Sequence, residues 1–265
     1  MKLVSAAKLR RAQSAIEGMR PYQQKLDNIL STFLCGTSEI STPYTADREV
    51  KRVAIIIVSS STSLCGSYNA NIIRTAKELI EEYRSADIEI ELFPVGKKIV
   101  EAITKMGLPF NDALMEQAAV VSYSEVSVVA SELMRRFEAC ELDKIEILYT
   151  RFLSAAKQLP VKELFLPIDI ENITKDSLFP SCEYIVEPCK KDFIEQLLPR
   201  VVTLRLFTAL LDSVAAEHAA RMMAMQIATD NAEELIGDLV LEYNKGRQQA
   251  ITNELLDIVS GSMNE

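Results

Sequence analysis

Hydrophobic positions near the start of the chain recur at the spacing of a coiled coil. From Leu9 to Phe33 the pattern advances in steps of three and four residues, and seven of its eight positions are apolar. The positions are Leu9, Ala12, Ile16, Met19, Gln23, Leu26, Leu30 and Phe33. This spacing predicts a helix that turns one face toward a second helix. Pro21 lies inside the run and is expected to kink or divide the helix, because proline lacks a backbone donor.

A longer pattern of the same kind occupies the C-terminal part of the chain. From Phe207 to Leu239 the steps alternate between four and three residues, and eight of the ten positions are apolar. No proline follows Pro199, so we expect one helix over about 200–260. Because a small domain cannot bury so long a helix, it is expected to pair antiparallel with the first helix, which would cover it only to about residue 230.

Between these two patterns, strand and helix signals alternate. The runs expected to be strands are Val53–Val58, Ile88–Phe93, Ile145–Phe152, Val161–Leu166 and Tyr184–Val186. Those expected to be helices are Ala70–Tyr83, Lys97–Met106 and Glu125–Ala139. Strands separated by helices predict a largely parallel sheet covered on both faces. We therefore predict an α/β chain in which a Rossmann-like domain, 51–190, is inserted between two coiled-coil helices, 1–50 and 191–265.

The composition excludes several classes of function. Only 8 of the 265 residues are glycine, and neither a G-x-G-x-x-G nor a P-loop sequence occurs, so a phosphate-cradling loop is not expected. One histidine and five cysteines without a C-x-x-C pair predict no metal site, no catalytic site and no cofactor. The net charge of −9 argues against nucleic acid as a partner.

Three positions are candidates for chemistry. The segment Ser63–Asn69 occupies the place of a ligand loop in a doubly wound domain, but Cys65 within it is expected to be a buried structural thiol. His218 is expected to set the register of the coiled coil rather than to act as a base. Arg221 is expected either to pair with a carboxylate across the coil or to extend its charged end into solvent.

The longest uncharged stretch, Val53–Ile73, has only six continuous apolar residues before it becomes polar. It therefore predicts a buried strand that enters a loop, and any membrane association is expected to come through a partner. The odd number of cysteines and the lack of a signal peptide pattern predict reduced thiols in a cytosol.

Three segments carry a resemblance to a known family. Residues 1–13, MKLVSAAKLRRAQ, closely resemble the N-terminal helix signature of the γ subunits of F-type ATP synthases. Residues 217–232 and 243–255 look like the C-terminal signature of that family, and LCGSYN at 64–69 is similar to its central motif. The family usually has Asp-Arg-Gly before that motif, where this chain has Ser61, Thr62 and Ser63, and glycine where it has Ser67.

The resemblance implies a non-catalytic rotor shaft inside a ring of α and β subunits, which hold the hydrolytic sites. The inserted domain would contact the ε subunit and the membrane c-ring, at the cytoplasmic side of a bacterial plasma membrane. By the same resemblance, Arg247, Gln248 and Thr252 would contact the β subunit's catch region, and Lys2 and Leu3 would lie near a β-subunit loop.

The chain also begins several turns late relative to the family, so a truncated or misassigned start is expected. Such missing residues, or another chain, would cover the apolar positions beyond residue 230 of the long helix. Two other interpretations stay open at this point. One is a Rossmann-type nucleotide-binding enzyme with a coiled-coil dimerisation arm, and the other is a general coiled-coil scaffold.

Overall fold

The structure is a computed structural model that describes residues 1–35, 43–45, 48–118, 121–168, 186–187 and 189–262. The chain divides into two compact units, Met1–Met223 and Ala224–Glu265. The first unit contains a sheet domain and two packed helices. The second unit consists of the C-terminal part of one long helix, and most of its side chains are exposed.

A four-stranded mixed sheet lies at the centre of the first unit. Its strands are β1 (Arg52–Val58), β2 (Glu89–Val95), β3 (Lys144–Phe152) and β4 (Gln158–Leu166), in the order β2-β1-β3-β4. The pairs β1/β2 and β1/β3 are parallel, as predicted, whereas β3 and β4 are antiparallel. The five residues between β3 and β4 are too few for a crossover and form a hairpin instead. Of the last expected strand, Tyr184 and Ile185 lie outside the described residues.

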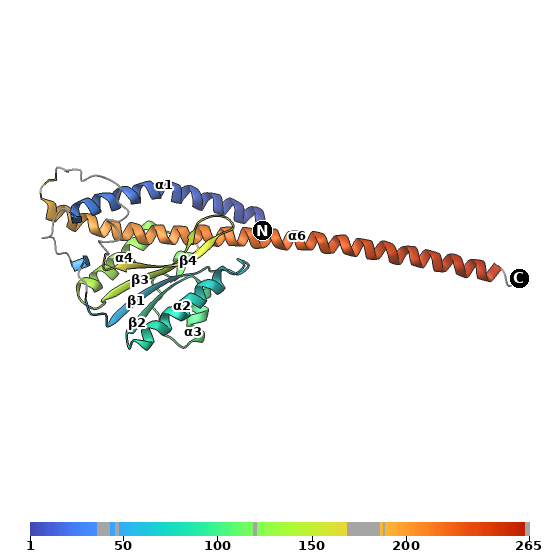
Figure 1. Cartoon of the computed structure of the whole chain (residues 1–265), viewed down its shortest axis with the longest axis horizontal. Helices are drawn as coiled ribbons and strands as arrows, with labels where there is room; N and C mark the ends of the chain where they lie inside the picture. The colour runs from blue at the N-terminus through green and yellow to red at the C-terminus, as the bar shows by residue number, and fades with distance from the viewer. Residues whose placement is uncertain (36–42, 46–47, 119–120, 169–185, 188, 263–265) are drawn as a thin grey trace. The chain divides into compact units, whose positions relative to one another are not determined.

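Helices cover both faces of the sheet (Figure 1). The helices α2 (Tyr68–Ser85) and α3 (Lys97–Lys105) lie on one face and bury Val53, Ile55 and Ile57 of β1. The opposite face carries α4 (Tyr123–Glu138) together with parts of both long helices. Two short 3-10 turns, η1 (Pro43–Thr45) and η2 (Met115–Ala118), complete the described elements. The predicted α/β class with helices on both faces is confirmed.

The two long helices are α1 (Lys2–Cys35) and α6 (Lys190–Ser262). Pro21 lies within α1 and does not divide it. The helix α6 begins ten residues before the expected start, and Pro199 lies inside it. The residues before Pro199 stay helical because Ile194, Leu197 and Leu198 are buried in the domain core, and this burial offsets the lost backbone hydrogen bond.

The predicted seam of α6 is only partly correct. Leu211 and Val214 are half-buried, and four alanines close to them in the sequence are buried. Ala215 and Ala219 pack against α1, while Ala216 and Ala220 pack against the sheet domain near Cys65 and Tyr68. A single coiled-coil stripe was the wrong expectation here, because α6 is contacted from two sides and small residues allow both neighbours to approach closely.

Candidate functional site

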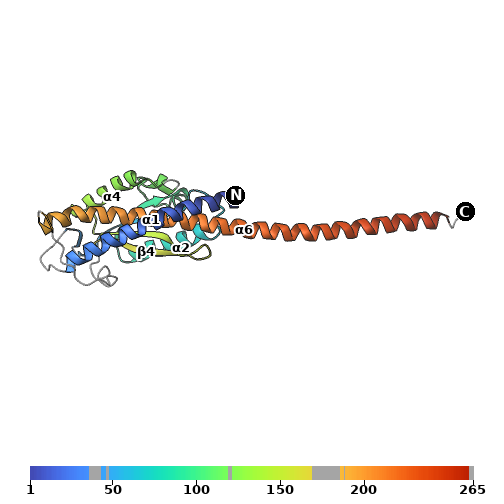
Figure 2. The ribbon, with the colours of Figure 1, turned by 90° about the horizontal axis from the view of Figure 1, so that it is seen from above.

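The seam between α1 and α6 is the largest feature that the sequence predicted correctly. Leu9, Ala12 and Ile16 of α1 are buried against Ala215 and Ala219 of α6. Figures 1 and 2 both show α1 running beside the first part of α6. Apolar side chains at coiled-coil spacing therefore pack the two helices against each other over several turns.

Two ion pairs establish that the helices run antiparallel. The guanidinium of Arg20 lies 3.4 Å from Asp212, and that of Arg205 lies 2.7 Å from Asp27. Residue numbers thus rise along α1 as they fall along α6. Burial raises the pKa of Asp212, and the charge of Arg20 opposes that rise. The predicted antiparallel pairing is confirmed within Met1–Met223.

A polar joint connects α6 to the loop between β1 and α2. The Arg221 guanidinium donates 2.7 Å hydrogen bonds to Glu217 Oε1 and Thr62 Oγ1, and a longer bond of 3.4 Å to the Ser63 carbonyl oxygen. We expected Arg221 to pair with a carboxylate on the opposite helix of the coil. This expectation was wrong, because its partner Glu217 lies one turn earlier on the same helix. Both charged side chains are nearly enclosed, with 11% of Arg221 and 8% of Glu217 exposed.

A second contact of the joint comes from the first residue of α2. The phenol of Tyr68 lies 2.7 Å from Ser213 Oγ on α6, and burial raises its pKa. Beside it, Cys65 is buried and accepts a hydrogen bond from Asn69 Nδ2 at 3.1 Å, as expected for a structural thiol. We call Thr62, Tyr68, Ser213, Glu217 and Arg221 the polar joint.

His218 lies beside the polar joint without belonging to it. Its Nδ1 is 3.3 Å from the Arg221 guanidinium. Burial lowers the pKa of the imidazole to about 4, and the charges of Arg221 and Lys8 act in the same direction. The ring is therefore neutral at neutral pH. Within the described part of the chain, the ring's hydrogen-bond contact is with the Arg221 guanidinium, and no carboxylate there orients it as a general base.

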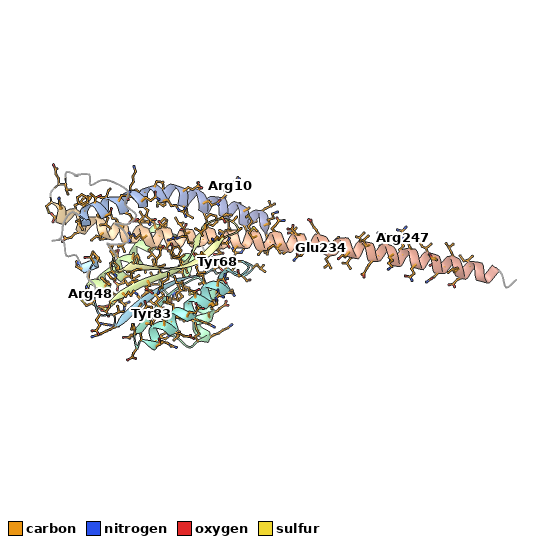
Figure 3. The ribbon with its side chains drawn as sticks, viewed as in Figure 1. Arg10, Arg48, Tyr68, Tyr83, Glu234 and Arg247 are labelled. Atoms are coloured by element: carbon orange, nitrogen blue, oxygen red, sulfur yellow. The ribbon has the colours of Figure 1, made fainter. Side chains whose placement is uncertain are left out.

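The five residues predicted to contact other subunits occupy two places. Lys2 and Leu3 form the first turn of α1, where Leu3 is 83% exposed. Arg247, Gln248 and Thr252 lie in the unit Ala224–Glu265 and are exposed. Figure 3 shows the Arg247 side chain standing out from its helix. Thr252 Oγ1 donates a 2.9 Å hydrogen bond to the Gln248 carbonyl, so these two positions are linked along the helix.

The unit Ala224–Glu265 exposes many large apolar side chains. Each of the following is at least 46% exposed: Ile227, Leu235, Ile236, Leu239, Val240, Leu241, Tyr243, Ile251, Leu255, Leu256 and Ile258. A series of this size on one helix is typical of a surface that binds another protein. The observed loss of burial after residue 226 agrees with the expectation that α1 covers α6 only to about 230.

Sequence reasoning missed the polar joint because its members are distant along the chain. Thr62 is 159 residues from Arg221, and Tyr68 is 145 residues from Ser213. One indication was present in the sequence. The loop after the buried strand is rich in serine and threonine, whose hydroxyl groups can accept hydrogen bonds from a charged side chain. The loop that would hold a nucleotide in a Rossmann-type enzyme is thus partly engaged by α6.

Among the described residues, no three or more His, Cys, Asp or Glu side chains form a cluster that could hold a metal ion. In the same residues, no helix combines the length and apolarity needed to cross a bilayer.

Comparisons with known proteins agree along nearly the whole chain. The profile of a protein family described as ATP synthase matches residues 1–263. The ATP synthase gamma chain of Phocaeicola vulgatus is 50% identical, in an alignment covering 99% of this chain and 92% of that protein. The gamma chain of Bacteroides thetaiotaomicron is 46% identical with the same coverage of both proteins.

Solved structures share the fold. A chain from the central stalk and c-ring of the Tetrahymena thermophila mitochondrial ATP synthase matches with a TM-score of 0.61 at 24% identity. That match covers 86% of this chain and 97% of the other. A chain of the Euglena gracilis mitochondrial ATP synthase matches with a TM-score of 0.54 at 21% identity, covering 98% and 94%.

Proposed function

Because the chain belongs to the ATP synthase gamma-chain family, we propose that it acts as the central rotor shaft of the F1 sector. In that role it transmits torque between a membrane c-ring and the catalytic β subunits and holds no catalytic site itself. The observation that carries the proposal is the long series of exposed apolar side chains in the helical unit Ala224–Glu265. A ring of α and β subunits would cover this surface.

The helix pair in Met1–Met223 supports a mechanical role. A shaft under torque has to resist bending and twisting, and a helix without glycine or proline in its interior is stiff. Between Pro199 and Gly237 the sequence of α6 contains neither residue. The buried seam, two ion pairs and the polar joint connect α6 to its neighbours at several levels. We therefore propose that residues 1–50 and 191–265 form the shaft and that residues 51–190 form the foot.

The foot is proposed to contact the ε subunit and the c-ring. The similar gamma chains named above come from bacteria, and the matched structures come from mitochondrial assemblies that include a c-ring. The family therefore works in a membrane-associated complex. The finer location that we propose is the cytoplasmic side of a bacterial plasma membrane, with attachment only through the complex.

The proposed contacts with the β subunits use polar groups on an exposed helix. Arg247 and Gln248 can donate hydrogen bonds to carboxylate or carbonyl oxygens, and Thr252 lies one turn further along the same face. Lys2 and Leu3 offer a charge and an exposed apolar side chain at the start of α1.

Co-expression with the α and β subunits of the same organism tests the proposal. A tagged chain is expected to purify in a complex with both subunits, and the complex is expected to hydrolyse ATP. Arg247→Ala should lower this hydrolysis several-fold, because a charge-assisted contact is lost. Lys245→Ala, two residues away and also exposed, is the matched control and should have no effect. Recovery of the chain as a free monomer that binds a nucleotide would instead support the Rossmann-type enzyme.

A further inference from the structure

The polar joint lies near the end of the unit Met1–Met223, where α6 continues into the second unit. It uses Ser213 and Arg221 of α6, and Arg221 precedes the end of the unit by two residues. From 227 to 258 the side chains of α6 are exposed. Torque that passes along α6 from one unit to the other therefore crosses the level of the polar joint.

The residues that α6 buries at this level are small. Ala215 and Ala219 pack against α1, whereas Ala216 and Ala220 pack against the sheet domain. Closer to its start, α6 buries larger side chains such as Leu206 in the domain core. Methyl groups form a shallow surface that interdigitates little with its neighbours. Packing alone therefore opposes rotation of α6 about its own axis less at the alanines than in the domain core.

Hydrogen bonds at two positions join α6 to the sheet domain here. The Tyr68 phenol lies 2.7 Å from Ser213 Oγ, and the Arg221 guanidinium donates a 2.7 Å bond to Thr62 Oγ1. Both partners in the sheet domain belong to the segment that leads from β1 into the first turn of α2, where Figure 3 labels Tyr68. Ser213 and Arg221 are eight residues apart, or about 12 Å along the helix axis. Bonds at two levels restrain both the rotation and the tilt of α6.

The side chains that make these bonds have little freedom to move. Ser213 is 1% exposed and Tyr68 is 5% exposed. The Arg221 guanidinium is held in turn by Glu217 Oε1, which lies 2.7 Å away on the preceding turn of the same helix. Because close-packed side chains have few alternative rotamers, a rotation of α6 has to displace the bonded atoms themselves.

The geometry limits the rotation that these bonds tolerate. A rotation of α6 by about 10° moves an atom that lies roughly 5–6 Å from the axis by about 1 Å. A shift of this size stretches or bends a 2.7 Å hydrogen bond beyond its favourable range. We propose that the polar joint fixes the angle of α6 relative to the sheet domain, with Thr62 and Tyr68 as positioning residues for the transmission of torque. This inference rests on the proposed rotor function.

Angular fluctuations of single complexes test the inference. The full chain is assembled with α and β subunits, the ring is fixed to a surface, and a bead on the sheet domain reports its angle in the absence of ATP. Combining Thr62→Val with Tyr68→Phe removes both hydroxyl groups and nearly keeps the shape of each side chain. The angular distribution of the bead should broaden by about 10°, the rotation that the bonds oppose. Thr62→Ser in place of Thr62→Val keeps one hydroxyl and should restore part of the narrow distribution.

Two controls separate this role from a general loss of stability. Combining Thr104→Val with Tyr123→Phe removes two hydroxyl groups from exposed positions of the sheet domain, and the angular distribution should not change. Ile103 is buried in the cluster that α2 and α3 form on the opposite face of the sheet from α6. Ile103→Val should therefore lower the free energy of unfolding without broadening the angular distribution.

An angular distribution that stays narrow without the two hydroxyl groups would overturn the inference, and so would equal broadening by Ile103→Val. Rotation of the unaltered complex after ATP is added tests the rotor function itself. A complex that rotates but whose distribution does not broaden in the double variant contradicts only the role of the polar joint. Failure of the unaltered chain to assemble with the ring contradicts the proposed function and the inference that rests on it.

Discussion

Replacing Arg221 by methionine should destabilise the unit Met1–Met223, because the change leaves the carboxylate of Glu217 buried without its partner. The two groups lie 2.7 Å apart and are 11% and 8% exposed. Breaking a fully buried ion pair costs about 3–5 kcal/mol. The small remaining exposure lowers our expectation to about 2–3 kcal/mol, a value that includes the lost bond to Thr62. At typical urea m-values this corresponds to a fall of about 1 M in the midpoint.

The assay is urea unfolding followed by circular dichroism, with Glu217→Gln in the background of Arg221→Met. This double variant should regain most of the lost stability, because no buried charge remains.

Burial raises the pKa of Glu217, and Arg221 opposes that rise. A carboxyl group with a raised pKa in the folded state contributes stability at low pH that is lost as the pH rises through that pKa.

Removing Arg221 raises the pKa of Glu217 further, so the destabilisation should be smaller near pH 5 than near pH 8. Arg10→Met, at an exposed position of α1, serves as the matched control and should change the midpoint little at either pH. Equal destabilisation by Arg221→Met at both pH values, or no rescue by Glu217→Gln, would refute this reasoning about the polar joint.

Three further predictions concern single positions. Ile16→Ala should lower the free energy of unfolding by about 2–4 kcal/mol, because the side chain is 3% exposed in the seam; Glu17→Ala, on the exposed face, should change it by less than about 0.5 kcal/mol. Gly96→Ala should cost about 2 kcal/mol or more in the same assay, since its φ is +92° and a Cβ would lie 2.5 Å from a backbone oxygen. Gly18→Ala, in open helix, should be neutral or stabilising. His218 is the only histidine, so a single NMR resonance should titrate near pH 4, and a midpoint near 6.5 would contradict its burial. Because the unfolded state binds the proton more readily, this group should reduce stability as the pH falls from about 6.5 toward 4.

Patterns of local spacing predicted the helices and the buried strands well. The α1 seam was correct because Leu9, Ala12 and Ile16 form one apolar stripe, and this stripe packs on α6 together with Phe152 of β3. The run Val53–Val58 was recognised because a strand covered on both faces is continuously apolar.

Features that depend on several neighbours were not predictable from local spacing. The helix α6 packs on α1 and on the sheet domain, so alanines at two adjacent faces carry its contacts instead of one heptad stripe. The helical conformation around Pro199 depends on burial of residues that tertiary packing brings together. The polar joint combines segments far apart in the chain, and no spacing rule connects them.

The central claim is that this chain turns as a shaft within a ring of catalytic subunits. The most direct measurement attaches a bead to the sheet domain of the chain, in a surface-fixed complex with the α and β subunits, and follows the bead after ATP is added. The account predicts continued rotation in one direction for as long as ATP is hydrolysed. A bead that stays fixed while the same complexes hydrolyse ATP would contradict it.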